Sequence, residues 1–175
     1  MISRIAMIGT RSPEDLFYNM FYTLSASFTK KGICVHTGNA DGIDNAVVFG
    51  AKSANPKYLY LYLPWKTFNS HYFSDCPQIN IIEEPSRECL ESVPHHHPNP
   101  KYLSQGAYKL HARNYGIIME PKVDLVIAYP NDSNLGGGTY QGIRIAQCHN
   151  IPVYNLRLDE DKYHLKLLLK DLELL

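Results

Sequence analysis

The chain has 175 residues, of which 45% are hydrophobic, and its 17 basic residues balance its 17 acidic residues. This length and apolar content predict one folded domain and argue against a disordered chain. The zero net charge argues against a protein whose main task is to coat DNA, because neutralisation of phosphates by basic residues supplies most non-specific affinity.

The first half of the chain alternates short apolar runs with amphipathic segments. The apolar runs predict strands at Ile2–Ile8, Ile33–His36 and Tyr58–Leu63. Apolar residues at helical spacing predict a helix that Ser12 caps and Gly32 ends, and a second helix at Ile43–Lys52. Such alternation implies a parallel sheet with helices on both faces.

The middle of the chain, residues 64 to about 104, is less regular and contains six prolines. We predict an elaborated excursion of the same domain here, with one strand at Ile79–Ile82. It includes the run His95-His96-His97, whose adjacent side chains cannot readily face one metal ion, and no cysteine or histidine lies at zinc-finger spacing. We therefore interpret this run as a solvated loop and predict no metal site.

Regular elements return in the last third of the chain. The pattern predicts helices at Gly106–Met119, Thr139–Cys148 and Lys162–Leu174, and strands at Val123–Tyr129 and Pro152–Asn155. Residues 1–175 are thus expected to form a single α/β domain. The expected fold is a Rossmann-like, doubly wound, mostly parallel sheet with helices on both faces.

The sequence contains no recognisable targeting or membrane segment. The apolar run before Arg11 suits a buried strand rather than a signal peptide, and no stretch approaches the about 20 apolar residues of a membrane span. The four cysteines form no Cys-x-x-Cys pair, so we interpret them as free thiols: Cys34, Cys76, Cys89 and Cys148. These features predict a cytoplasmic protein without membrane contact.

Two glycine-containing turns lie more than a hundred residues apart, at Gly9–Ser12 and Gly136–Thr139. Each follows a predicted strand and opens a predicted helix. Glycine lets the backbone approach a ligand closely, and a helix N-terminus offers unpaired N–H groups with a partial positive charge. If the fold brings the two turns together, they form a phosphate-binding crevice at the point where the strand order reverses.

A third segment, Thr37–Asp44, also joins a predicted strand to a predicted helix. We expect Gly38 and the amides after it, including that of Asn39, to approach the ligand. Asp41 or Asp44 would contact a ribose hydroxyl or a base, and either is a candidate for acid–base catalysis if it is desolvated. The alternative for Asp41 is that it only caps the helix.

Arg11 and Arg113 are the best candidates for direct phosphate contacts, because a guanidinium pairs with phosphate through two hydrogen bonds. The alternative for Arg113 is an arginine on the surface of a helix. With neighbouring Asn114, the candidate ligand-binding residues are Gly9, Thr10, Arg11, Ser12, Gly38, Asn39, Asp41, Asp44, Arg113, Asn114, Gly136, Gly137, Gly138 and Thr139.

These segments together resemble the Rossmann-like core of the DNA-processing protein A (Smf) family. The family's G-S-R turn is similar to Gly9–Ser12, its S-G-x-A-x-G-I-D motif to Thr37–Asp44, its R-N-R-I-I segment to Arg113–Ile118, and its last glycine turn to Gly136–Thr139. The resemblance covers about residues 5–155. The core that it resembles belongs to the wider SLOG superfamily, which also includes the Lonely Guy phosphoribohydrolases.

Two departures from these families bear on function. Tyr115 stands at the second arginine of R-N-R, which is a plausible DNA contact. Gly142 stands three residues after Thr139, where Lonely Guy enzymes carry a catalytic glutamate. This second departure weakens the case for the phosphoribohydrolase reaction and leaves the phosphate-binding argument intact.

Three functions follow as hypotheses. The first is binding of a nucleotide or nucleotide-derived ligand, for sensing or sequestration. The second is hydrolysis of the N-glycosidic bond of a nucleoside monophosphate, and the third is single-stranded DNA binding of the DNA-processing protein A type. No cofactor is predicted. A homo-oligomer is expected for two reasons. The resemblance to SLOG proteins implies a dimer or larger oligomer, and the tyrosines of residues 58–73 suit an interface.

Overall fold

The computed structural model describes residues 2–131 and 137–174. They form one α/β domain around a six-stranded, all-parallel sheet with the strand order β4-β3-β2-β1-β5-β6. The strands are β1 (Arg4–Gly9), β2 (Cys34–Thr37), β3 (Leu59–Tyr62), β4 (Asn80–Ile82), β5 (Leu125–Tyr129) and β6 (Val153–Asn155). The predicted doubly wound parallel sheet is confirmed.

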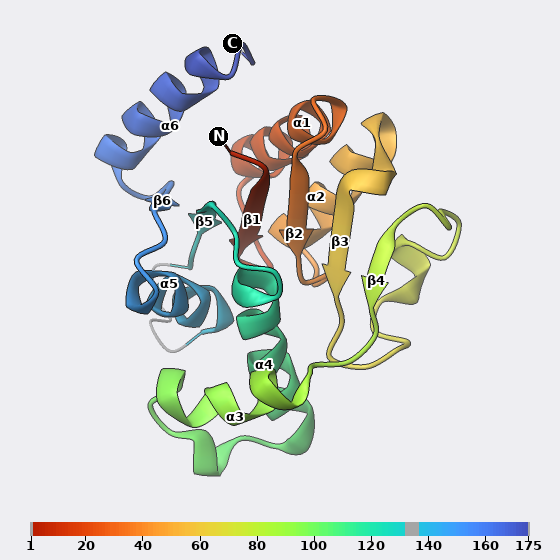
Figure 1. Cartoon of the computed structure of the whole chain (residues 1–175), viewed down its shortest axis with the longest axis vertical. Coiled ribbons are helices and arrows are strands. Elements are labelled where there is room, and N and C mark those ends of the chain that lie inside the picture. Colours follow the sequence, from red (N-terminus) through yellow and green to blue (C-terminus); the bar gives the residue numbers. More distant parts are fainter. Residues whose placement is uncertain (1, 132–136, 175) are drawn as a thin grey trace.

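Helices cover both faces of the sheet (Figure 1). One face carries α1 (Asp15–Lys30), α2 (Ile43–Ala54) and α6 (Asp159–Asp171), and the other carries α3 (Arg87–His96), α4 (Gln105–Met119) and α5 (Gly138–Cys148). Three short 3-10 helices lie at Pro56–Tyr58, Ser70–Tyr72 and Pro100–Tyr102. Among the helices so described, none is long and apolar enough to span a bilayer.

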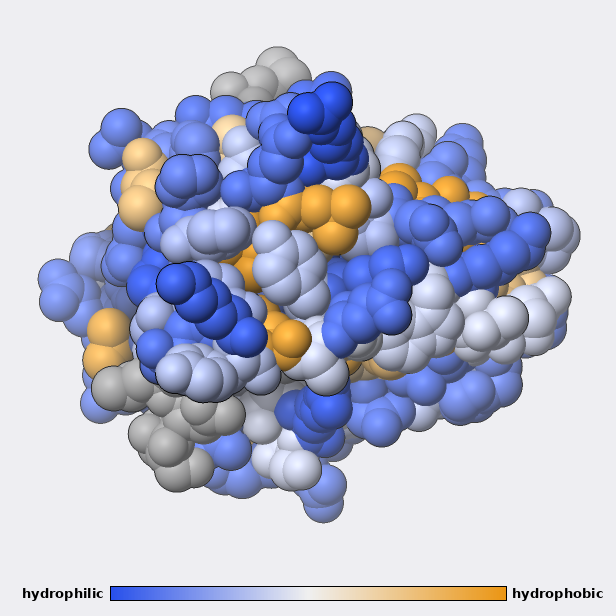
Figure 2. Space-filling model, turned by 90° about the horizontal axis from the view of Figure 1, so that it is seen from below, coloured by the Kyte–Doolittle hydropathy of each residue, from blue (hydrophilic) through white to orange (hydrophobic). Residues whose placement is uncertain are grey.

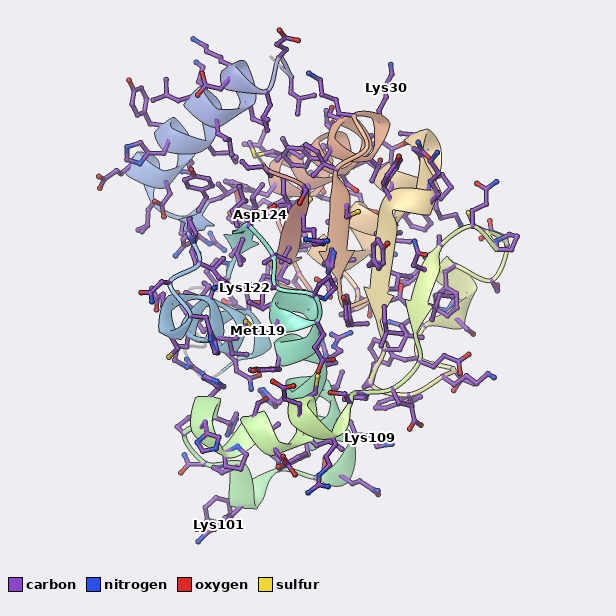
Figure 3. All side chains as sticks on the ribbon, viewed as in Figure 1. Lys30, Lys101, Lys109, Met119, Lys122 and Asp124 are labelled. Carbon is purple, nitrogen blue, oxygen red and sulfur yellow. The ribbon has the colours of Figure 1, made fainter. Side chains whose placement is uncertain are left out.

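The central strand β1 shows why its sequence is continuously apolar. Ile5 and Met7 join the core cluster under α1, α2 and α6, whereas Ala6 and Ile8 join the cluster under α4 and α5. A strand covered on both faces has no polar side to present to water. At its start, the Asp124 carboxylate accepts the Ser3 N–H at 2.7 Å and the Arg4 N–H at 2.9 Å. Asp124 is labelled in Figure 3.

The excursion between β3 and α4 contains a helix that the sequence analysis interpreted as a loop. Helix α3 begins after Ser86, whose Oγ accepts the Cys89 N–H at 3.1 Å, and it reaches the middle of the histidine run. Cys89 and Val93 lie one turn apart and are buried in the cluster shared with α4. This packing holds the helix in spite of Pro94, which lacks an N–H group.

Two further expectations need correction. The first residue before α1 is Glu14, not Ser12, and no side chain caps this helix. The tyrosines of residues 58–73 are less exposed than expected, since Tyr62 is buried and Tyr58, Tyr60 and Tyr72 are partly buried. The homo-oligomer stays a prediction. The four cysteines are free thiols, as predicted.

The turns that follow β1 and β2 are in direct contact through Gly42. Its backbone has φ +77°, and a Cβ there would lie 2.4 Å from the Thr10 carbonyl oxygen. Next to it, the Ile43 N–H donates to the same oxygen at 3.1 Å. Only glycine fits this left-handed, crowded position, so the first turn of α2 is held against the Gly9–Ser12 turn.

Candidate functional site

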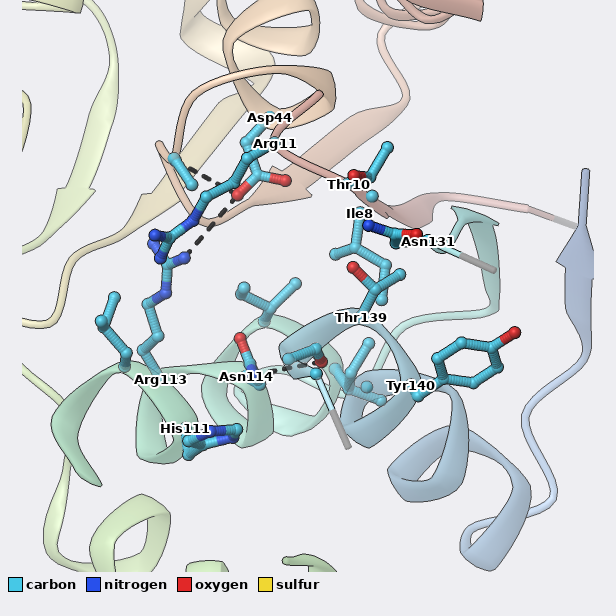
Figure 4. Close-up of a pocket in the computed structure, with 18 of the residues that line it drawn as sticks. Ile8, Thr10, Arg11, Asp44, His111, Arg113, Asn114, Asn131, Thr139 and Tyr140 are labelled. Carbon is cyan, nitrogen blue, oxygen red and sulfur yellow. Dashed lines mark hydrogen bonds and ion pairs between the residues drawn. The ribbon is translucent and has the colours of Figure 1, made fainter. Parts of the chain in front are cut away.

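The strand order reverses between β1 and β5, and a cavity of about 460 Å³ lies at the carboxyl ends of these strands. Ligands of open α/β sheets bind at such a switch point. Figure 4 shows Arg11, Arg113 and Asp44 on one side of the cavity and Thr10, Asn131 and Thr139 on the other. The end of the molecule viewed in Figure 2 is mainly hydrophilic, with apolar side chains exposed near its centre.

The fold brings most of the sequence-predicted residues together. The cavity is lined by Gly9, Thr10, Arg11, Ser12, Asp44, Arg113, Asn114, Gly137, Gly138 and Thr139. Gly38, Asn39 and Asp41 are not among its lining residues. Gly136 lies outside the described residues.

The N-terminus of α5 forms one wall of the cavity. Its first residues, Gly138, Thr139 and Tyr140, line the cavity, and the residue before the helix is Gly137, which offers no side-chain cap. In residues 2–131 and 137–174, no group accepts the N–H of these three first residues, and the Thr139 hydroxyl has no partner. This wall therefore presents unpaired donors at the positive end of a helix dipole.

Arg113 is buried beside the cavity, so its interpretation as a surface arginine is wrong. Its guanidinium lies 3.7 Å from the Asp44 carboxylate, donates to the Tyr62 carbonyl at 3.4 Å, and sits 5.3 Å from the centre of the Phe68 ring. Burial lowers the pKa of Arg113 to about 10, against the opposing effect of Asp44. The side chain thus stays positively charged at neutral pH.

Gly38 makes room for that guanidinium. A Cβ at this position would lie 2.6 Å from the Cζ atom of Arg113. Gly38 thus lies against Arg113, and a direct contact between this glycine and a ligand stays a prediction. Arg11, by contrast, is exposed, and in the described part of the chain it forms no hydrogen bond or ion pair.

The two carboxylates of the Thr37–Asp44 segment have different surroundings. Asp44 is 5% exposed, its Oδ2 accepts the Ala40 N–H at 3.2 Å, and burial raises its pKa while Arg113 acts in the opposite direction. Asp41 is exposed and accepts the Tyr72 hydroxyl at 2.7 Å. The helix cap predicted for Asp41 is wrong, since the residue before α2 is Gly42.

Asn39 has a structural role in the same segment. Its backbone is left-handed, with φ 61°, and its side-chain amide donates to the Phe68 carbonyl at 2.9 Å and the Asn69 carbonyl at 3.2 Å. The Asn69 amide returns a hydrogen bond to the Asn39 carbonyl at 3.0 Å. Asn39 thus ties the turn after β2 to the turn after β3.

The sequence analysis missed a polar group on the wall formed by α4 and α5. The Gln141 Oε1 accepts the Asn114 side-chain amide at 2.9 Å and lies 2.6 Å from the His111 Nδ1. His111 and Asn114 both line the cavity. The spacing of three residues between them, which places side chains on one face of a helix, was the available signal.

Gly142 stands where Lonely Guy enzymes carry a glutamate, and the described residues show no group of metal ligands. In the described ranges, no three histidine, cysteine, aspartate or glutamate side chains are grouped so as to hold a metal ion. Gly142 packs against β1, because a Cβ there would lie 2.6 Å from the Ile8 Cδ1 atom. A longer side chain at residue 142 would require Ile8 to move.

Comparisons with known proteins relate the chain through its fold. No protein-family model matches the sequence, and no curated protein matches it either. Among solved structures, DNA processing protein A from Helicobacter pylori, described as having a unique single-stranded DNA binding mode, matches with a TM-score of 0.59 and 20% identity. The match covers 86% of this chain and 63% of that protein.

DNA processing protein A from Streptococcus pneumoniae matches with a TM-score of 0.42 and 11% identity, over 87% of this chain and 58% of that one. This chain therefore spans less than two thirds of either protein. The likeness to the Helicobacter pylori protein supports a shared Rossmann-like fold, as the sequence resemblance implied.

Proposed function

We propose that the cavity binds the phosphate of a nucleotide or nucleotide-derived ligand. One observation carries this proposal: an 11-residue helix directs unpaired N–H groups into a cavity that Arg11 and the buried Arg113 also line. Helix N-termini and guanidinium groups both bind phosphate well, the first through unpaired N–H groups and the second through paired, charge-assisted hydrogen bonds. The cavity volume of about 460 Å³ is in the range of small-molecule sites.

Each lining group has a defined role in this proposal. The first turn of α5 and the Thr139 hydroxyl donate hydrogen bonds to phosphate oxygens, and the exposed guanidinium of Arg11 pairs with them. Arg113 lines the cavity as a buried positive charge that Asp44 and Phe68 hold in place. The contact between Asp44 and a sugar hydroxyl that the sequence analysis suggested stays a prediction: Asp44 lines the cavity, but it is only 5% exposed.

Single-stranded DNA is the second candidate ligand, and the observation in its favour is the shared fold with the Helicobacter pylori protein. In this case the cavity would hold one phosphate of a strand. The resemblance of the sequence motifs to the DNA-processing protein A and SLOG families supports both candidates, because each needs the same phosphate contact.

Calorimetric titration can separate these possibilities. A nucleoside monophosphate should bind about 10- to 100-fold more tightly than the matching nucleoside, since hydrogen bonds to a charged group contribute that much. Equal affinity for the two would contradict phosphate binding. A short single-stranded oligonucleotide that binds more tightly than the monophosphate, with a salt slope of about −0.7 per phosphate contacted, would identify DNA as the ligand.

The matched variants are Arg11→Gln and Arg87→Gln. Arg11→Gln should weaken the monophosphate about tenfold or more, because it removes a charged donor from the cavity. Arg87 lies on α3 in a surface pair with Glu91, 2.7 Å away, and its substitution should leave affinity unchanged. Equal effects of both substitutions would show that only overall charge matters.

A further inference from the structure

We infer that His111 is an additional ligand contact of the cavity, and that it takes up a proton when an anion binds there. The inference rests on the proposed phosphate site and adds a residue and a pH dependence to it. His111 projects from α4 together with Arg113 and Asn114, and all three line the cavity (Figure 4).

The hydrogen bonds around Gln141 determine which His111 nitrogen faces a ligand. The Gln141 Oε1 accepts from Asn114, so it is an acceptor for the His111 Nδ1 as well, and that nitrogen carries the hydrogen. In the neutral ring the lone pair is then on Nε2. In the described part of the chain, Nε2 has no hydrogen-bond partner. Protonation would give His111 a second N–H donor.

The groups that face His111 disfavour its positive charge in the empty cavity. Arg113 lies on the same helix, Arg144 is on α5, and the His97 ring, just after α3, has its centre 4.4 Å from that of His111. Burial is the largest cause that lowers the pKa of His111, and these three groups lower it further, although the bond to Gln141 acts in the opposite direction. His111 is therefore mainly neutral at pH 7 before a ligand binds.

An anion in the cavity reverses this balance. Its negative charge favours the protonated ring, which can donate from Nε2, so the pKa of His111 rises on binding. The protonated state then binds the anion more tightly than the neutral state does. Affinity should increase as the pH falls through the pKa of His111 in the complex, and should level off below its pKa in the free protein.

Inorganic sulfate is the suitable probe, because phosphate itself titrates near pH 6 and sulfate keeps its charge between pH 5 and pH 8. The sulfate affinity of the wild type should rise about tenfold over this range, the lower end for a hydrogen bond to a charged group. The rise should fall below about twofold in His111→Gln. The matched control is His164→Gln at an exposed position of α6, which should keep the wild-type profile.

A second measurement needs no variant: the NMR titration of the His111 ring with and without sulfate, which should show a higher pKa with sulfate. If the wild type and His111→Gln bind sulfate with the same pH profile, or the ring pKa does not move, the inference is wrong and the phosphate site stands. If neither protein binds any anion between pH 5 and pH 8, both the phosphate site and this inference are wrong.

Discussion

The segments that follow β2 and β5 both contain glycines and both open a helix, yet they use their polar groups differently. After β2, the side chains of Asn39, Asp41 and Asp44 all have partners within the protein. After β5, the described first turn of α5 leaves its N–H groups and the Thr139 hydroxyl without partners. The segment after β2 therefore supports the cavity, whereas the start of α5 is available to a ligand.

The largest expected effect is a loss of stability on substitution of Arg113, which supports the cavity. Arg113→Ala would leave the Asp44 carboxylate buried without its ion-pair partner, and we expect a loss of about 3–5 kcal/mol in the free energy of unfolding. Urea denaturation measures this loss. The control is Arg87→Ala, a surface arginine whose removal should cost at most about 1 kcal/mol. Similar losses for both would mean that Arg113 does not support the cavity.

Gly38→Ala tests the space that the guanidinium occupies. The added methyl group would overlap the Arg113 Cζ, so we expect a loss of about 1–3 kcal/mol, as for other overpacked sites, together with weaker binding of the monophosphate. Gly106→Ala is the matched control on α4, where a Cβ finds its nearest neighbour, Trp65, at 3.8 Å. There alanine should stabilise the helix by up to about 1 kcal/mol.

If Gly38→Ala and Gly106→Ala had the same effect on stability, the close approach of Gly38 to Arg113 would not matter to the fold. A stable Gly38→Ala protein with wild-type affinity for the monophosphate would show that the turn after β2 does not contribute to ligand binding.

Thr139→Val tests the ligand side. Because the hydroxyl has no partner in the described structure, its loss should hardly change the free energy of unfolding. Affinity for the monophosphate should fall about tenfold or more, the effect of a lost hydrogen bond to a charged group. Thr23→Val on α1, whose hydroxyl donates to the Asn19 carbonyl at 2.9 Å, should leave affinity unchanged. A large loss of stability in Thr139→Val would contradict the statement that the Thr139 hydroxyl is not used within the protein.

The smallest effect is expected for Asp41→Asn. The Tyr72 hydroxyl can still donate to the new amide, so unfolding should change by no more than about 1 kcal/mol, and monophosphate affinity should stay at the wild-type value. Calorimetry should compare the monophosphate affinities of Asp41→Asn and Asp44→Asn, because Asp44 lines the cavity and Asp41 does not. A loss of affinity in Asp41→Asn would return Asp41 to the binding site.

Much of the fold could be predicted because its signals are local. Apolar runs predicted the six strands, and helical spacing predicted α1, α2, α4, α5 and α6. Helix α3 could not be predicted, because Pro94 and the histidine run hide it and its stability comes from packing Cys89 and Val93 against α4. The position of the cavity could also be predicted, because the two glycine turns follow β1 and β5, which are neighbours in the sheet.

By itself, the sequence determined the order of the strands and of every α-helix except α3, the burial of both sheet faces, and the position of two glycine turns, since residue size, polarity and spacing act over a few neighbouring residues. Only the tertiary structure decided which polar groups are used internally. Gly38 accommodates Arg113, Asp41 pairs with Tyr72, and His111 shares Gln141 with Asn114. These partners lie at least 27 residues apart in the chain, and hydrogen bonds and ion pairs depend on distances that only folding sets.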